Sequence, residues 1–386
     1  MDKFSKTINY ILIKSIIIFL FICLLFYILE VNLDISNKIE QIVYKNNYDS
    51  FEIMKIRFKN DSFIYSHLEQ ITILSHIFNK NYTNLKKNKN NINICVSLNN
   101  LYIYKLIVSI ESVLRNCNYQ KTFITYHILC TKDITEKSLT ILKSFMKRYS
   151  LNLEMVIYNM GNNFWYLKNT RLTEATYYRL LLPIFVDLER ILYLDADTLT
   201  FKDLNEIYQL DFNNTYILGT LDYLSDGIDY LGIKSNKYIN AGTILINLEK
   251  IRNDKKYYDL INITLQTKLN NDDQTAFNYV LYPKIGLIPF KYNVFTFYDH
   301  SDIDEYLNSL RIQLSYKEIE DSIYDPTVIH SICGEKFWAK QYKRFKNNNI
   351  KYCRCTNYFC IWISYAKKTG YYKEISFILT PLRLQS

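Results

Sequence analysis

The sequence predicts an α/β fold with a mainly parallel central sheet, preceded by one transmembrane helix. Short apolar segments alternate with longer segments of helical periodicity, which is typical of βαβ units. One apolar run, residues 191–194, is followed at once by Asp195 and Asp197, and open α/β sheets bind ligands at the carboxyl ends of their strands. Residues 8–29 near the N-terminus are predominantly apolar. The first two observations predict the fold, and the third predicts the membrane helix.

Patterns of apolar residues locate the individual elements. Continuous apolar runs predict strands over residues 94–98, 122–129, 153–158, 191–194 and within 238–248. Apolar residues at helical spacing predict helices over residues 104–114, 135–149, 174–188 and 362–375. The helix over 174–188 is expected to end near Pro183, because proline breaks a helix interior. The alternation predicts a globular domain that begins at about residue 91.

Asp195 and Asp197 are separated by one residue at the end of the predicted strand 191–194. Hard cations such as Mg²⁺ and Mn²⁺ take oxygen ligands, often one or two carboxylates, and leave positions for substrate phosphates. The pair therefore suggests a divalent ion held between Asp195, Asp197 and a diphosphate. The alternative interpretation is a solvated acidic turn after a strand.

Composition limits the classes of function. The chain has 386 residues, 49% of them hydrophobic, which is ample for a large core. Its net charge of +9 favours anionic partners such as phosphates or lipid headgroups, but no nucleic-acid-binding motif is present. Cys353, Cys355 and Cys360 cluster without a nearby histidine, which makes a poor zinc site and leaves free or locally disulfide-bonded cysteines as the interpretation.

The apolar segment 8–29 has about the 20 residues that a helix needs to cross a bilayer. Three lysines precede its core and acidic residues follow it, so the positive-inside rule places the N-terminus in the cytoplasm. A signal peptide is disfavoured because no small-residue cleavage site follows, and a buried core helix remains the alternative. Residues 1–30 are thus expected to be a cytoplasmic tail and anchor, and the polar residues 31–90 a stem or linker.

From about residue 91 to 375 the chain resembles glycosyltransferase family 8, the retaining enzymes with a GT-A fold, which include lipopolysaccharide glucosyl- and galactosyltransferases and are related to glycogenin. The matching motifs occur in the family's order. They are Glu-Ala-Thr-Tyr-Tyr-Arg-Leu at 174–180, Leu-Tyr-Leu-Asp-Ala-Asp-Thr-Leu at 192–199, Asn-Ala-Gly within 239–248, Asp273-Gln274 with Asn278, and His330 with Lys336 and Trp338. The resemblance implies a GT-A, Rossmann-like nucleotide-diphospho-sugar transferase domain over 91–338, followed by a basic, aromatic, helical extension over 339–386.

The resemblance also implies roles for particular residues. Asp195, Asp197 and His330 would be ligands of Mn²⁺, with Mg²⁺ as the alternative ion. Arg179, Asp222 and Lys336 would hold the donor sugar or its diphosphate. Asn240 and Ala241 would line the sugar pocket, and Asp273 and Gln274 would be the catalytic pair that meets the sugar hydroxyls and the reacting face. For each, the alternative is an ordinary structural role, such as a helix-surface ion pair or an N-cap.

The sequence departs from the family pattern in two places. The turn after the first strand is usually rich in aspartate, and here it reads Leu98-Asn99-Asn100-Leu101-Tyr102. Asn99 has no charge but can still hydrogen-bond the nucleotide, as the usual aspartate would. Tyr102 is expected to stack on uracil. In the late motif Gly334 lies one place later than usual and Phe337 replaces a proline, so a differently shaped loop is expected.

The expected function is metal-dependent, retaining transfer of glucose or galactose from a UDP-sugar to a glycan or glycolipid. The alternatives are a glycogenin-like self-glucosylating enzyme and an inactive, membrane-tethered sugar-binding or scaffold protein. The expected location is a single-pass membrane protein, facing a Golgi-type lumen in a eukaryote or lying in the inner membrane of a bacterium.

Overall fold

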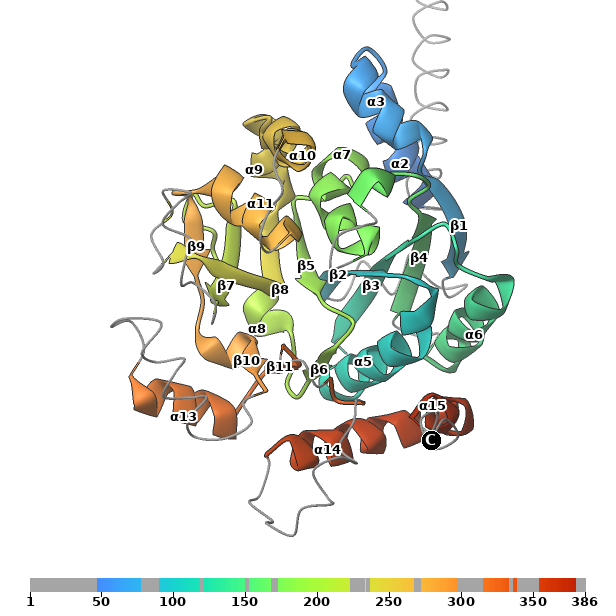
Figure 1. Cartoon of the computed structure of the whole chain (residues 1–386), viewed down its shortest axis with the longest axis vertical. Helices are drawn as coiled ribbons and strands as arrows, with labels where there is room; N and C mark the ends of the chain where they lie inside the picture. Colours follow the sequence, from blue (N-terminus) through green and yellow to red (C-terminus); the bar gives the residue numbers. More distant parts are fainter. Residues whose placement is uncertain are drawn as a thin grey trace, which may run out of the picture. The chain divides into compact units, whose positions relative to one another are not determined.

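The computed structural model describes residues 47–77, 90–118, 121–149, 153–167, 173–222, 233, 237–266, 272–296, 315–332, 336–338 and 354–379 (Figure 1). The chain divides into two compact units, Met1–Glu52 and Ile53–Ser386. The second unit contains both sheets. Helix α2 is Asn47–Phe58.

An eight-stranded sheet forms the centre of the second unit, in the order β1-β4-β3-β2-β5-β8-β7-β9 (Figure 1). Strands β4, β3, β2 and β5 run parallel to one another, and β7 runs parallel to β9. The strands are β1 Thr72–Ile77, β2 Asn90–Leu98, β3 Thr122–Cys130, β4 Leu153–Asn159, β5 Arg190–Leu194, β7 Ile217–Leu221, β8 Ile239–Asn247 and β9 Ile285–Leu287. The predicted α/β fold with a mainly parallel sheet is confirmed.

Strand β8 runs antiparallel to both of its neighbours, β5 and β7. Its start therefore lies beside the end of β5, with Leu194 opposite Thr243. The backbone N–H of Asp195 donates to the carbonyl of Gly242 at 2.8 Å, which extends this pairing beyond β5. The Asn-Ala-Gly segment is consequently placed beside the acidic motif.

A second, three-stranded sheet has the order β10-β11-β6. Its strands are β6 Thr198–Thr200, β10 Val294–Phe295 and β11 Val328–His330. β11 pairs antiparallel with β6, and His330 lies opposite Thr198. Because Thr198 directly follows Asp197, this pairing places His330 beside the acidic motif, although the two lie more than one hundred residues apart in the sequence.

Helices cover the sheets, with a main core between α5, α6 and the strands β2 to β5. The side chain of Thr135 accepts from the N–H of Ser138 at the start of α6, and Ser315 and Glu318 form a capping box on α13. The helices are α3 Ser62–Glu69, α5 Ile103–Asn116, α6 Glu136–Met146, α7 Leu182–Phe185, α8 Asn205–Tyr208, α9 Leu248–Asn253, α10 Lys256–Gln266, α11 Asp272–Leu281, α13 Tyr316–Tyr324, α14 Arg354–Lys368 and α15 Tyr372–Leu379.

The helix predicted over 174–188 differs from the structure. Residues Glu174–Leu181 form a 3-10 helix, η4, and the short α-helix α7 follows it. The helical segment ends at Phe185, near Pro183, but Pro183 itself lies in the first turn of α7. A proline suits a first turn because the N–H that it lacks has no partner there.

The sheet begins earlier in the chain than the predicted boundary at residue 91. β1 is an edge strand that pairs antiparallel with β4, from Thr72 opposite Asn159 to Ile77 opposite Met155. The ring of His67 in α3 hydrogen-bonds Asn163 at 2.6 Å, just beyond β4. The part of the predicted stem from Ile53 to Ile77 therefore belongs to the compact unit of the sheet.

The predicted membrane segment, residues 8–29, lies outside the described residues. Among the helices that the structure does describe, none combines the length and apolar character needed to span a bilayer. The membrane anchor thus stays a prediction from the sequence.

The C-terminal extension is helical where the structure describes it, in α14, which lies beside α5, and in α15, which contacts α14 (Figure 1, red). Trp362, Tyr365 and Ile375 are buried in a second core, together with Val108 of α5 and Ile329 of β11. The extension therefore packs against the domain through its aromatic side chains.

Candidate active site

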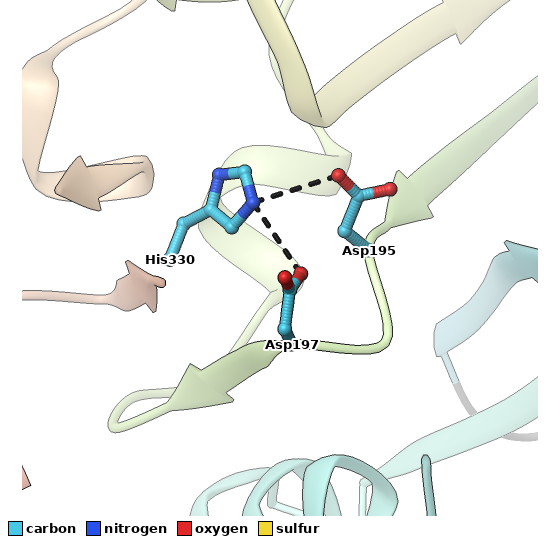
Figure 2. Close-up of side chains that lie close together, drawn as sticks. All are labelled: Asp195, Asp197 and His330. Atoms are coloured by element: carbon cyan, nitrogen blue, oxygen red, sulfur yellow. Dashed lines mark ion pairs between the residues drawn. The ribbon is translucent and has the colours of Figure 1, made fainter. Parts of the chain in front are cut away.

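Three predicted metal ligands converge at the junction of the two sheets. The Nε2 atom of His330 lies 3.5 Å from Oδ2 of Asp195 and 3.4 Å from Oδ1 of Asp197 (Figure 2). One ligand atom from each of the three residues lies within 4.8 Å of the others. Two carboxylates and an imidazole nitrogen thus face a common point.

The backbone around the three residues is fixed by hydrogen bonds. The hydroxyl of Thr198 donates to the carbonyl of Asp195 at 2.8 Å, and the N–H of Ser331 donates to the carbonyl of Asp197 at 3.1 Å. Gly242 leaves room for the imidazole, because a Cβ at this position would lie 2.0 Å from Cε1 of His330. Only a glycine therefore permits the observed approach of strand β8 and His330.

The donor set suits a divalent cation. Two ligands at right angles on a cation with bonds of about 2.1 Å lie about 3 Å apart, close to the nitrogen–oxygen separations at His330. Carboxylates and imidazole are ligands that Mn²⁺ accepts. The Nδ1 atom of His330 is buried and has no hydrogen-bond partner among the described residues, so Nε2 is the nitrogen presented to the carboxylates.

Lys336 adds a positive charge beside the acidic pair. Its ammonium lies 2.5 Å from Oδ2 of Asp197 and donates to the carbonyl of Ser331 at 2.6 Å. Burial alone would raise the pKa of Asp197, but Lys336 and His330 outweigh it and hold this pKa well below its usual value. Burial would lower the pKa of Lys336, and Asp197 raises it above the usual value. Asp197 and Lys336 are therefore both charged at neutral pH.

Arg179 of η4 links the acidic motif to helix α11. Its Nε atom donates to Oδ2 of Asp273, and Nη1 donates to the carbonyl of Ala241 at 2.6 Å. Nη1 also lies 3.4 Å from Oδ1 of Asp195, and the guanidinium lies over the ring of Tyr193 at 4.4 Å. Asp273 is only 1% exposed, so its charge is compensated mainly by Arg179.

A second network orders the start of β8. Asp222 accepts from Asn240 at 3.0 Å and from the side-chain amide of Gln274 at 2.8 Å. The Oε1 atom of Gln274 accepts from the N–H of Ala241 at 3.0 Å, which fixes both ends of this amide. The predicted residues Asp222, Asn240, Ala241 and Gln274 are thus joined by hydrogen bonds, and Arg179 connects them to Asp195.

The turn after β2 contributes an aromatic group. Tyr102 packs edge to face with Trp338, with ring centroids 6.0 Å apart, and the ammonium of Lys105 lies 4.1 Å from the centroid of Tyr102. Burial and then Asp197 raise the pKa of Tyr102. Its partner Trp338 lies two residues after Lys336, which pairs with Asp197. The side-chain oxygen of Asn99 accepts from the N–H of Leu101 within the turn itself.

Some residues of the site were missed by reasoning from the sequence. Asn293 is fully buried and donates to Asn240 at 2.9 Å and to Thr220 at 3.1 Å. It lies directly before β10, in a segment without a recognised motif, so no sequence signal marks it. Lys105 was also missed, although its position three residues after Tyr102 in a predicted helix was a usable signal.

This arrangement defines a class of protein. A Rossmann-like sheet, with an Asp-x-Asp pair at the end of one strand and a histidine brought to it by another, is the GT-A architecture of nucleotide-sugar transferases. The family model "Glycosyl transferase family 8" matches residues 93–342, which is more than half of the chain. The chain therefore belongs to glycosyltransferase family 8 and is a hexosyltransferase.

Known proteins resemble the chain to different extents. A Haemophilus influenzae protein assigned as a glycosyltransferase is 29% identical over 267 residues, covering 65% of this chain and 74% of that protein. The lipopolysaccharide 1,2-glucosyltransferase of Escherichia coli is 28% identical over 208 residues, covering 48% of this chain and 57% of that protein. The galactosyltransferase LgtC, solved with donor and acceptor sugar analogs, superimposes with a TM-score of 0.56 at 19% identity, covering 72% of this chain and 96% of that one. The last comparison supports the fold.

Proposed function

We propose that the protein is a Mn²⁺-dependent, retaining glycosyltransferase that moves glucose or galactose from a UDP-sugar to a glycan or glycolipid acceptor. The observation that carries this proposal is the convergence of Asp195, Asp197 and His330 on one point. A relative named for lipopolysaccharide 1,2-glucosyl transfer, and a structural neighbour named for galactosyl transfer, support the hexose and the acceptor class.

The proposed chemistry assigns a task to each network. A divalent cation held by Asp195, Asp197 and His330 would neutralise negative charge on the departing diphosphate. Lys336 brings a further positive charge to the same place, where it stabilises the leaving group as a point charge. Arg179 and Asp222 hold the backbone of Ala241 and the amide of Gln274 in place, so that these polar groups can orient the donor sugar.

Retention of configuration requires either a protein nucleophile or attack from the face of the leaving group. Asp273 is paired with Arg179, and Asp222 accepts from two side-chain amides. These commitments make both carboxylates poor nucleophiles. We therefore favour attack on the same face, with a diphosphate oxygen as the base, and a trapped covalent glycosyl–enzyme adduct would contradict this.

The proposal is tested by offering the full-length chain a panel of nucleotide hexoses, with Mn²⁺, with Mg²⁺ and with a chelator. We expect hydrolysis or transfer with UDP-glucose or UDP-galactose that needs the metal and is lost in Asp197→Asn. A matched control is Asp254→Asn, because Asp254 is exposed and bonds Tyr216 and Lys250 outside the site. If the wild-type protein turns over none of the donors, the inactive scaffold becomes the better explanation.

The proposal includes a membrane anchor formed by residues 8–29, with the N-terminus in the cytoplasm. Its support is the length of the apolar segment and the lysines that precede it. Cell fractionation tests it: the full-length chain should sediment with membranes and resist extraction by high salt. Release by salt alone would contradict a spanning helix.

A further inference from the structure

Lys105 is a cation without a carboxylate partner in the described part of the chain. Its ammonium lies 4.1 Å from the ring centroid of Tyr102 and 5.0 Å from that of Trp338. Two aromatic faces thus hold the charged end of the side chain in place. Burial lowers the pKa of Lys105 and Asp197 raises it in part, so the ammonium is partly desolvated.

The position of Lys105 in its helix is electrostatically unfavourable. It lies in the first turn of α5, Ile103–Asn116, where the helix dipole repels a cation. This turn contains no acidic residue, and Tyr102 at its N-cap makes no side-chain hydrogen bond to the helix. A partly buried ammonium with no acidic residue in its own helical turn is a favourable partner for an anion.

The charges of the site leave a role for such a cation. The positive charge of Arg179 is taken by Asp273, and a divalent ion would offset Asp195 and Asp197. The two phosphates of a nucleoside diphosphate sugar then face one positive charge, that of Lys336. Lys105 supplies a second one, because its ammonium lies over the ring of Trp338, two residues along the chain from Lys336.

We infer that Lys105 binds a phosphate group of the nucleotide donor, and that Tyr102 and Trp338 hold its ammonium in position to do so. This inference rests on the proposed nucleotide-sugar donor. Trp338 lies two residues after Lys336, which pairs with Asp197, so the aromatic pair and the ammonium of Lys105 adjoin the acidic motif. Lys105 is then a phosphate contact and a determinant of affinity for diphosphates over nucleosides.

The test compares the affinities of uridine, UMP and UDP for the full-length chain, measured calorimetrically with Mn²⁺ present. In Lys105→Met we expect UDP to bind about tenfold more weakly or worse, because a charge-assisted contact is lost. Uridine, which has no phosphate, should bind within about twofold of the wild-type affinity. Lys105→Arg keeps the charge and should restore most of the affinity for UDP.

The matched control is Lys132→Met, the same change at an exposed lysine that bonds Asn162 after strand β3. It should leave all three affinities unchanged. Equal losses for uridine and UDP in Lys105→Met would show that the lysine only supports the aromatic rings, and unchanged UDP affinity would also overturn the inference. A wild-type protein that binds none of the three ligands would instead overturn the proposed donor. If Lys105→Met fails to fold, Lys105→Gln makes the same comparison.

Discussion

At the scale of single residues, Gly242 determines whether His330 can reach the acidic motif. A Cβ at position 242 would lie 2.0 Å from Cε1 and 2.3 Å from Nδ1 of the imidazole, so Gly242→Ala must displace the ring. Displacing a catalytic group by about 1 Å costs roughly a hundredfold in rate, and we expect a loss of that order in hexosyl transfer. Steady-state assays over a range of Mn²⁺ concentrations measure it.

Gly219→Ala is the control for this prediction. Gly219 lies in β7 of the same sheet, and its Cβ would meet the side chains of Ile239 and Ile244 instead of His330. This variant should lose stability but keep the turnover and Mn²⁺ requirement of its folded fraction. Equal activity in Gly242→Ala and the wild type would show that His330 is not needed where the structure places it.

At the scale of elements, a buried carboxylate joins helix α5 to the turn after α6. Glu111 is fully buried, bonds Nε of Arg115 at 2.5 Å and accepts from the hydroxyl of Tyr149 at 2.6 Å. Burial and the hydrogen bond to Glu111 raise the pKa of Tyr149 to about 12. The neutral tyrosine therefore stabilises the fold below the usual tyrosine pKa of about 10, and this contribution is lost as pH rises from about 10 to about 12.

Tyr149→Phe should consequently lower the free energy of unfolding by about 1–2 kcal/mol near pH 8, because a hydrogen bond to a charged group is removed. The difference between variant and wild type should shrink as pH rises above about 10. Urea denaturation at several pH values measures both. The control is Tyr324→Phe, at a residue that is 72% exposed, and it should show neither effect. If Tyr149→Phe lowered the free energy of unfolding equally at all pH values tested, the hydrogen bond from Tyr149 to Glu111 would not be the cause.

Sequence patterns identify elements better than they identify how elements pair. The strands at β2, β3, β4 and β5 were predicted because each is a continuous apolar run, as buried parallel strands are. The antiparallel direction of β8 was not predicted, because periodicity is the same in either direction. Strand β1 was missed because an edge strand buries little and its sequence, Thr72–Ile77, lies among polar segments.

The candidate site was predictable to the extent that its residues lie in recognisable motifs. Asp195, Asp197 and His330 were named from the sequence, and the structure brings them together. Asn293 was not, because a lone asparagine before a two-residue strand has no distinguishing pattern. The link between Arg179 and Asp273 likewise depends on a long-range contact between η4 and α11, which no spacing in the sequence expresses.

At the scale of the whole molecule, the C-terminal helices connect to the candidate donor site. Trp362 of α14 is 3% exposed, and its ring centroid lies 5.8 Å from that of Trp338. Trp338 in turn packs against Tyr102. Trp362→Ala should lower the free energy of unfolding by about 3–5 kcal/mol, as truncation of a buried tryptophan does. It should also weaken UDP binding, because Trp338 loses its support.

Chemical denaturation measures the first effect and calorimetry the second. Trp165→Ala is the control, since Trp165 is 61% exposed and should cost no more than about 0.5 kcal/mol. A Trp362→Ala variant as stable as the Trp165→Ala variant would show that the C-terminal helices are not part of the folded domain.

The most direct test of the metal-dependent account is a titration of the full-length protein with Mn²⁺, followed by the paramagnetic signal of the free ion. We predict one Mn²⁺ per chain in the presence of UDP, bound at least about tenfold more weakly in His330→Ala and in Asp197→Asn, because each variant removes one ligand. Unchanged Mn²⁺ affinity in both variants would mean that Asp195, Asp197 and His330 do not hold the ion, and the account would fail.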